Sequence, residues 1–573
     1  MTGMGGEMGG EEQAAGSERL RNLRARRKAT RWLDQAQPIV VSVWLAIVVT
    51  GLWPPAHGAA RGNSPALTSV GVLLVLTLAG RLIADPVTPL RELPLLVRLG
   101  EVLERPLFTS ARFVPWAASG FVAIMGAVSV CRHATFGSST FDLGLFENVV
   151  WNTVHGRFLW SDVLGRSFLG EHVSPVLLAV ALPYALIPRA PTLLVLQAAA
   201  LAAGAFPLAR LARRELDDPP LTAALVVAYL AYLPLRNVAR FDFHPVALAT
   251  PLLLEAFVSF REGRWRRGVW AWGLALACDE AVAAPAAALG LYVLLVLRRR
   301  RLGFELSAFA VLWFVAAVLV IVPAFRHGPY PFFDRLGSLR TGRWLALVSL
   351  DRFALLGEVL APLAFLPLLS PVHAALALPS LMLDWLSDSR HQHSIAFHYT
   401  ATVTPLLFCA TVLGIAKLVE REDLRVVLAF YPTIPDLKRY AAVLLLLGAI
   451  VFTGWSPVAQ IRAGWGAARD DRAAAVARVP AGAPVSAQAH LGAHLARRRG
   501  VALFPERLAP WILVDEAGPP WPLARQQDLA SWTMRLNADP GCRLDTERGA
   551  VRLFACDPPA LARLGPSDAP ARP

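Results

Sequence analysis

The chain has 573 residues, of which 55% are hydrophobic and only 17% are charged, and its formal net charge is +14. A soluble protein of this size needs more charge to cover its surface. Apolar runs of roughly 15 to 22 residues recur along most of the sequence, which indicates a polytopic α-helical membrane protein. The basic residues lie in short clusters between these runs, as the positive-inside rule predicts, so we expect no nucleic-acid partner.

The N-terminal part is predicted to lie in the cytoplasm. Residues 1–37 are rich in glycine and glutamate and then in arginine, which is typical of a disordered, basic segment. No small-residue cleavage site follows, so we expect an uncleaved membrane anchor. Residues 38–112 are predicted to add two transmembrane helices, 38–53 and 66–83, and an arginine-rich cytoplasmic loop.

Residues 113–457 are predicted to form the transmembrane core. The run 113–130 leads outward and places the loop 132–172 on the external face. Two apolar runs follow with only four residues between them, 173–187 and 192–211. Either both cross the membrane, or the first lies on or dips into the outer leaflet and only the second crosses. The positive-inside rule favours the second arrangement, because that arrangement keeps the arginines at 210–214 on the cytoplasmic side.

About thirteen spans are expected in total. The remaining ones lie at 221–235, 245–260, 268–277, 281–297, 304–325, 355–369, 372–386, 401–415 and 441–455. This count places the N-terminus in the cytoplasm and the C-terminus outside a plasma membrane, in the periplasm of a cell that has one.

Residues 458–573 differ from the core because they carry more charge. The segments 484–487 and 551–555 have strand character, which predicts a small external α/β domain. Cys542 and Cys556 flank a turn-like stretch and can close a hairpin if that end lies in an oxidising compartment.

The external loops of this topology collect many polar side chains. Carboxylates, imidazoles and an arginine at one depth are the mixture needed to bind a phosphate and move a proton. They come from four segments: Asp142, Glu147, His155, Asp162, Glu171 and His172; Asp242 and His244; Asp279 and Glu280; and Asp388, Arg390, His391, His393, His398 and Tyr399.

Several of these residues have a purely structural interpretation as well. Asp142 can cap a helix that begins at the next residue, because aspartate is a preferred N-cap. His172 and His244 each precede an apolar run and can anchor it at the interface. The pair 279–280 can be a solvated turn between two helices.

The loop 387–399 leaves two further alternatives open. Arg390 can pair with Asp388 instead of with a phosphate. Three histidines, 391, 393 and 398, suggest a structural zinc site, but no cysteine accompanies them, so no residue is assigned to a metal. No cofactor is expected with certainty, although a divalent metal is compatible with the site.

Several short blocks in order resemble a bacterial and archaeal membrane family, domain of unknown function 2079. The resemblance covers roughly residues 113–560, and Asp279 departs from the lysine expected before Glu280. The matching blocks are Phe141-Asp142-Leu143-Gly144, Trp151-Asn152-Thr153, His155-Gly156, His172-Val173-Ser174-Pro175, Gln197, Phe243-His244-Pro245, Asp279-Glu280, Leu386-Ser387, Ser394 and His398-Tyr399.

That family in turn resembles, more distantly, the GT-C membrane glycosyltransferases. The resemblance implies an all-α core of the GT-C type and transfer of a sugar from a polyprenyl-phosphate donor at the outer face. Asp142 matches the acid of the first external loop, and Asp242 stands where a second acid often lies. Substrate-binding roles then fall to His172, His244, Glu280, Arg390, His398 and Tyr399, with Arg236 and Arg240 as further phosphate candidates.

The implied partners are the lipid-linked sugar donor and membrane lipid, with 173–187 as a wall for the prenyl chain. The acceptor is not specified. Two other functions stay open: a transporter or flippase of a lipid-linked or anionic substrate, and a non-catalytic membrane scaffold. Transporters often show repeated halves and place ionisable groups near the membrane midplane, and neither feature is visible in the sequence.

Overall fold

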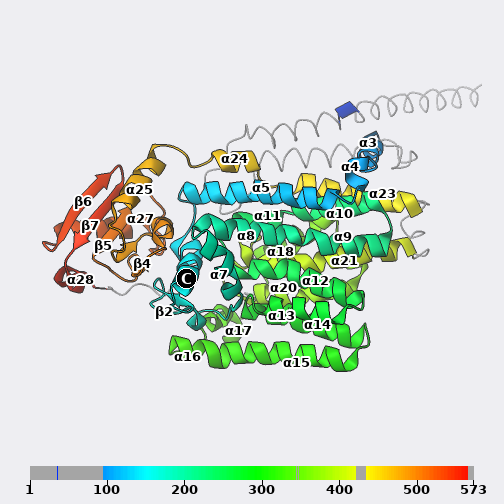
Figure 1. Ribbon diagram of the computed structural model, residues 1–573, viewed down its shortest axis with the longest axis horizontal. Helices are drawn as coiled ribbons and strands as arrows, with labels where there is room; N and C mark the ends of the chain where they lie inside the picture. The colour runs from blue at the N-terminus through cyan, green and yellow to red at the C-terminus, as the bar shows by residue number, and fades with distance from the viewer. Residues whose placement is uncertain (1–34, 37–93, 344, 346–347, 421–433, 566–573) are drawn as a thin grey trace, which may run out of the picture.

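The computed structural model describes residues 35–36, 94–343, 345, 348–420 and 434–565. The spans expected at 38–53 and 66–83 lie outside the described residues, as does nearly all of the N-terminal segment expected to be disordered. The described part is a bundle of helices that run along the long axis of the molecule, with a small α/β domain at one end (Figure 1). This architecture agrees with the predicted all-α core and C-terminal α/β domain.

Within the described residues, four helical segments are long and apolar enough to cross a membrane. They are Phe113–Ala134 (α5), Ala190–Leu216 (α8 and α9), Arg300–Arg326 (α15, η6 and α16) and Val403–Glu420 (α21). Pro219–Ala231 (α10) and Leu233–Arg240 (α11) make a fifth if this pair, bent by 44°, counts as one span. The expected number of about thirteen is therefore not confirmed by the described residues.

Several other expected spans are short helices. Val176–Leu186 (α7) has 11 residues, about half the length needed for a hydrocarbon core. It thus does not cross alone, whereas the segment of α8 and α9 has 27 residues. Other core helices are Ala249–Arg261 (α12), Trp265–Leu276 (α13), Ala283–Leu295 (α14) and Ile434–Val451 (α23).

The spans expected at 355–369 and 372–386 are broken into short pieces. The helices there are Leu350–Leu360 (α18), Pro371–Ala374 (α19) and Leu378–Leu386 (α20), joined by 3-10 turns. Prolines at positions 362, 367, 371 and 379 explain the breaks, because proline has no backbone N–H to donate.

Helices α14 and α15 pack backbone to backbone. A β-carbon at Gly290 would collide with Ser307, and one at Gly303 would collide with the backbone of Leu294. Glycine at both positions lets the helices approach closely, as small residues do in membrane bundles. This contact fixes the segment after α16 (Val322–Arg326) beside the residues that precede α14.

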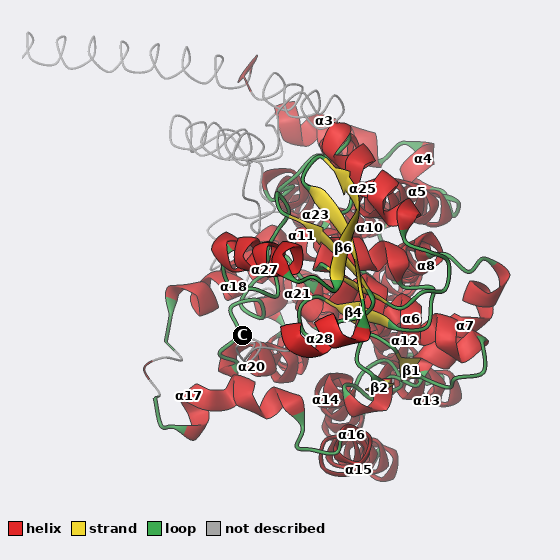
Figure 2. Ribbon diagram, turned by 90° about the vertical axis from the view of Figure 1, so that its left-hand side faces the viewer, coloured by secondary structure: helices red, strands yellow, loops and turns green. Residues whose placement is uncertain are grey.

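Residues 458–565, here called the tail domain, contain a five-stranded sheet, whose strands are yellow in Figure 2. The strand order is β4-β3-β5-β7-β6. Strands β3 (Val485–Ala487), β4 (Val501–Leu503) and β5 (Trp511–Asp515) are parallel, and β7 (Val551–Cys556) and β6 (Cys542–Arg548) are antiparallel. The strands expected at 484–487 and 551–555 correspond to β3 and β7.

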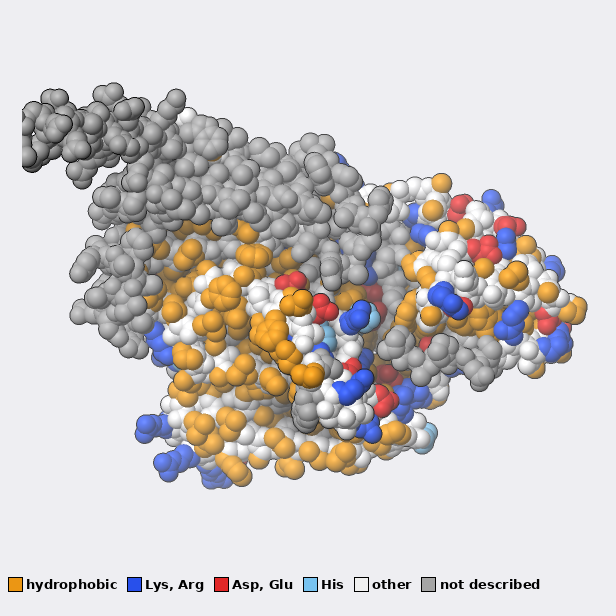
Figure 3. All heavy atoms as spheres, turned by 180° about the vertical axis from the view of Figure 1, so that it is seen from behind, with side chains coloured by type: hydrophobic (Ala, Val, Ile, Leu, Met, Phe, Trp, Pro, Cys, Tyr) orange, Lys and Arg blue, Asp and Glu red, His pale blue; other side chains and the backbone are white. Residues whose placement is uncertain are grey.

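The two faces of the sheet are covered differently. On β5, Ile512 and Val514 share a core with Leu529 and Trp532 of α27 (Gln526–Ala538), whereas Leu513 belongs to the large core that continues into the bundle. This alternation follows from the two-residue period of a strand. Charged side chains gather on the tail domain, and hydrophobic ones cover the bundle face seen in Figure 3.

The tail also contains the hairpin proposed from its cysteines. Cys542 and Cys556 stand opposite each other on β6 and β7 and form a disulfide. After β7 the described part of the tail continues into α28 (Pro558–Leu564).

Candidate functional site

Five segments meet at the end of the bundle that faces the tail domain. They are the loop after α5, the loop between α11 and α12, the turn between α13 and α14, the segment after α16 and the loop after α20. Four of them contain the polar residues singled out from the sequence. The fifth, residues 327–343, was not anticipated.

Asp142 lies in a short π-helical turn, η2 (Thr140–Gly144), which leads into α6 (Leu145–Val154). The hydroxyl of Ser139, and not the Asp142 carboxylate, caps this turn by accepting from the Phe141 N–H at 3.1 Å. Oδ1 of Asp142 instead lies 3.4 Å from Nε2 of His244, and its side chain is 29% exposed. The carboxylate therefore faces an imidazole and remains accessible.

His244 has a defined tautomer. Its Nδ1 lies 3.0 Å from the backbone carbonyl of Asp242, and a carbonyl only accepts, so Nδ1 carries the proton. In the neutral ring Nε2 is then an acceptor that faces the Asp142 carboxylate. Two acceptors therefore face each other, so the pair can take up one proton and hold it between them, which suits it to act as a general base.

His398 and Tyr399 complete this part of the site. The rings of His244 and His398 stack with centroids 3.7 Å apart. Burial, with His244 nearby, lowers the pKa of His398 well below its usual range, so this ring is neutral near pH 7. The Arg335 guanidinium donates a hydrogen bond to the Tyr399 hydroxyl.

Asp242 is close in sequence to His244 but has different partners. Its Oδ1 accepts from Arg132 at 2.6 Å and its Oδ2 from the Ser139 N–H at 2.8 Å, and its side chain is fully buried. Asp242 thus holds the turn that carries Asp142. Its catalytic role remains a prediction, and both of its carboxylate oxygens are occupied.

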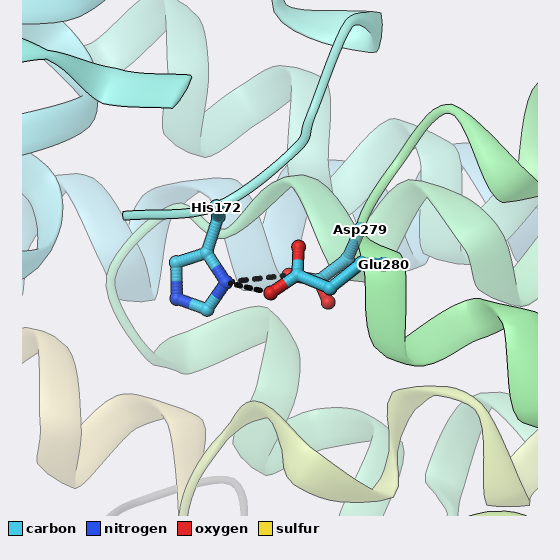
Figure 4. Close-up of side chains that lie close together, drawn as sticks. All are labelled: His172, Asp279 and Glu280. Atoms are coloured by element: carbon cyan, nitrogen blue, oxygen red, sulfur yellow. Dashed lines mark hydrogen bonds and ion pairs between the residues drawn. The ribbon is translucent and has the colours of Figure 1, made fainter. Parts of the chain in front are cut away.

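His172, Asp279 and Glu280 form a second cluster (Figure 4). Nδ1 of His172 lies 2.9 Å from Oε1 of Glu280 and 3.5 Å from Oδ2 of Asp279. Glu280 also accepts from the Val173 N–H at 2.9 Å and from the Tyr330 hydroxyl at 2.8 Å. The turn at 279–280 is therefore part of a buried polar network.

The charges of this cluster shift its titration. Burial lowers the pKa of His172, but Glu280 and Asp279 together outweigh that effect and raise the pKa to about 9. Burial and the Glu280 charge raise the pKa of Asp279 to about 6, against the opposing effect of His172. At neutral pH the imidazole is therefore the positive charge between two carboxylates.

The segment after α16 supplies residues that the sequence reasoning missed. Tyr330 contacts Glu280, the ring of Phe332 stacks on His172 with centroids 4.6 Å apart, and Arg335 contacts Tyr399. Tyr330 also lines an open pocket of 630 Å³ together with Arg326 and Arg340. The place of this segment in the sequence could have indicated its role. It is rich in aromatic residues and arginine, and it directly follows the outward span expected at 304–325.

The structure does not bring Arg390 to these residues. Its side chain is exposed, and neither a hydrogen bond nor an ion pair joins it to the rest of the described chain. The alternative pairing with Asp388 is not formed either. Asp388 accepts from the Ser338 N–H at 2.7 Å and lies 3.8 Å from Arg352.

The histidines of this loop do not converge on one point. His393 contacts the Ser387 carbonyl at 2.8 Å, and His391 packs edge-on against Phe397. Among the described residues, the group able to hold a metal ion is His172 with Asp279 and Glu280.

Arg236 and Arg240 serve the connection to the tail domain. Arg236 donates to the carbonyls of Thr453 and Trp455 at 2.8 and 2.7 Å. Arg240 donates to the side chain of Gln460 at 3.0 Å. These partners lie between the end of α23 and the end of α24 (Pro457–Arg462), so both arginines are used to hold the start of the tail.

The tail domain rests on the loop that carries Asp142. The Thr140 hydroxyl donates to the Ala489 carbonyl at 2.6 Å, and the Asn148 amide donates to the Ala496 carbonyl at 2.8 Å. Phe141, next to Asp142, lies with its ring centroid 6.0 Å from that of Trp521. The carboxyl ends of β3 and β5 therefore face η2.

The fold and the arrangement of polar groups at one end of apolar helices define a polytopic membrane protein. Residues 132–533 match the family model described as "Predicted membrane protein (DUF2079)", and the chain belongs to this family. The resemblance drawn from the short sequence blocks is thereby confirmed. No curated protein matches the chain.

Two solved structures are similar to the chain at low identity. One is ArnT from Cupriavidus metallidurans bound to undecaprenyl phosphate, with 14% identity, a TM-score of 0.48, and coverage of 80% of this chain and 100% of that one. The other is the same protein in the apo state, with 14% identity, a TM-score of 0.45, and coverage of 79% and 100%.

Proposed function

We propose that the protein is an inverting glycosyltransferase with a GT-C-like core, which moves a sugar from a polyprenyl-phosphate donor to an acceptor at the outer face of the membrane. The observation that carries this proposal is the Asp142–His244 pair, an accessible carboxylate 3.4 Å from an acceptor nitrogen. A transferase of this kind needs a general base beside the acceptor hydroxyl, and this pair meets the requirement.

The reaction follows from these groups. The acceptor oxygen attacks the anomeric carbon as the bond from that carbon to the phosphate oxygen breaks. Asp142 takes the hydroxyl proton, and His244 Nε2 shares it. Because the attack inverts the anomeric carbon directly, no covalent enzyme intermediate and no nucleophilic serine or cysteine is required.

The departing polyprenyl phosphate needs cationic and hydrogen-bonding partners. Arg335 and Tyr399 lie beside His398, and Arg326 and Arg340 line the neighbouring pocket with Tyr330. An arginine fork suits phosphate because it offers two parallel donors. We therefore assign the phosphate contacts to the 326–340 segment in preference to Arg390.

The prenyl chain needs an apolar path from this site to the bilayer. Helix α7 begins four residues after His172 and exposes Leu182, Leu186 and Ile187 to 72%, 84% and 60%. Burying such residues in lipid or against a prenyl chain is favourable. This agrees with the expected role of 173–187 as a wall for the lipid.

The test is a donor panel. Purified protein is incubated with a set of polyprenyl-phosphate sugars and mixed acceptors, and released polyprenyl phosphate is measured by mass spectrometry. Consumption of one donor with formation of a glycosylated product supports the proposal. If no donor is consumed but proteoliposomes move a lipid-linked substrate across the bilayer, the protein is a transporter instead.

A further inference from the structure

We propose that His172, Asp279 and Glu280 bind a divalent transition-metal ion such as Mn²⁺ or Zn²⁺. Each residue offers one ligand atom, and these atoms all lie within 4.8 Å of one another. His172 precedes α7, whereas Asp279 and Glu280 lie between α13 and α14, so the fold brings the donors together from distant segments (Figure 4). The proposal does not depend on the transfer reaction.

The distances between the donor atoms suit one ion. Ligands about 2.1 Å from a metal are about 3.0 Å apart at a right angle and about 3.4 Å apart at a tetrahedral angle. Nδ1 of His172 lies 2.9 Å from Oε1 of Glu280 and 3.5 Å from Oδ2 of Asp279. A metal ion can therefore replace the Nδ1 proton while the imidazole keeps these distances to both carboxylates.

The charge balance also favours a cation. The Glu280 side chain is 1% exposed and that of Asp279 is 17% exposed. Neither carboxylate has an ion pair with arginine or lysine in the described part of the chain. Glu171, the residue before His172, has two such pairs, with Arg166 at 2.6 Å and Arg326 at 3.0 Å. A buried and a partly buried carboxylate that share a single imidazole are undercompensated, since burying a charge is costly unless it is paired.

The groups around the donors hold them in place. Oδ1 of Asp279 accepts from the Ala281 N–H at 2.8 Å, while Glu280 is held by Val173 and Tyr330. The His172 ring packs on Phe332. Partners of this kind orient metal ligands and fix their geometry.

The donor set identifies the class of ion. One imidazole with two carboxylates suits Mn²⁺, Fe²⁺ or Zn²⁺ better than Ca²⁺, which prefers oxygen ligands alone. Three protein ligands leave coordination positions open, as in catalytic metal sites. The open positions suit an oxygen ligand such as a phosphate.

The experiment measures metal binding directly. Full-length protein in detergent is stripped with EDTA, exchanged into metal-free buffer and titrated with Mn²⁺, with free Mn²⁺ followed by electron paramagnetic resonance and Zn²⁺ added as competitor. Wild type should bind one ion per chain. Asp279→Asn and Glu280→Gln should weaken binding at least tenfold. Asp470→Asn should match wild type, because this carboxylate lies in the tail domain and its side chain is 71% exposed.

Folding is controlled within the same series. Asp279→Asn keeps an oxygen for the Ala281 N–H, so its thermal unfolding should stay near that of wild type even if Glu280→Gln is destabilised. The proposal is overturned if wild type binds neither ion stoichiometrically, if Asp279→Asn binds as tightly as wild type, or if Asp470→Asn loses binding to the same extent.

Discussion

Gly492 of the tail domain packs directly on the side chain of Thr140, two residues before Asp142. A β-carbon at position 492 would collide with the Thr140 hydroxyl, which itself donates to the Ala489 carbonyl at 2.6 Å. The tail domain therefore forms part of the support for the turn that presents Asp142. A small movement of that turn changes the distance from Asp142 to His244.

Gly492→Ala should consequently lower transfer activity while the chain remains folded. A displacement of about 1 Å at a catalytic group can cost on the order of a hundredfold in rate. Adding Thr140→Ala removes the obstructing atoms and should restore part of the activity. Gly273→Ala is the matched control, because a β-carbon there meets nothing within 4 Å. Equal loss in the single and double variants would argue against a positioning role.

Asp142→Asn tests the proposed base. Asparagine keeps the size of the side chain but removes its basicity, so activity should fall on the order of a hundredfold or more. Thermal stability should stay close to wild type, because Ser139 and not Asp142 caps the turn. Asp470→Asn in the tail, where the side chain is 71% exposed, serves as the control. Activity within a few fold of wild type in Asp142→Asn would remove this residue from the mechanism.

Arg335 and Arg390 separate two assignments of the phosphate contact. Arg335→Gln should raise the KM for the lipid-linked donor by on the order of tenfold, since it removes a charged contact next to Tyr399 and His398. Arg390→Gln should have a KM near wild type, because this side chain is exposed and away from the cluster. The reverse pattern would favour the assignment made from the sequence.

Membrane sidedness is tested with single cysteines. In a Cys131→Ser background, with Cys278 and Cys409 buried, Arg390→Cys and Ala524→Cys should react with an impermeant reagent added to intact cells. Arg264→Cys should react only after lysis, because it lies at the opposite end of the bundle, among the charges that surround Arg210, Glu255 and Glu262. Labelling of positions 390 and 524 from different sides would contradict the topology.

The sequence alone determined the class of protein and several of its elements. The apolar run 113–130 corresponds to α5, and the strand-like segments 484–487 and 551–555 correspond to β3 and β7. These features depend on local composition and periodicity, which a sequence displays directly. The sequence also predicted that the polar loops of the site share the external face. Span lengths and clusters of arginine assign each loop to a side of the membrane.

Only the tertiary structure decided which polar groups touch. Asp242 and Asp142 look alike in sequence, yet Asp242 pairs with Arg132, 110 residues away, and Asp142 faces His244. His172 meets Glu280 across 108 residues, and Tyr330 joins them from a third segment. Successive residues on a helix or turn point in different directions, so these contacts depend on how distant helices pack against one another. That packing, and not any local pattern, brings the two clusters together.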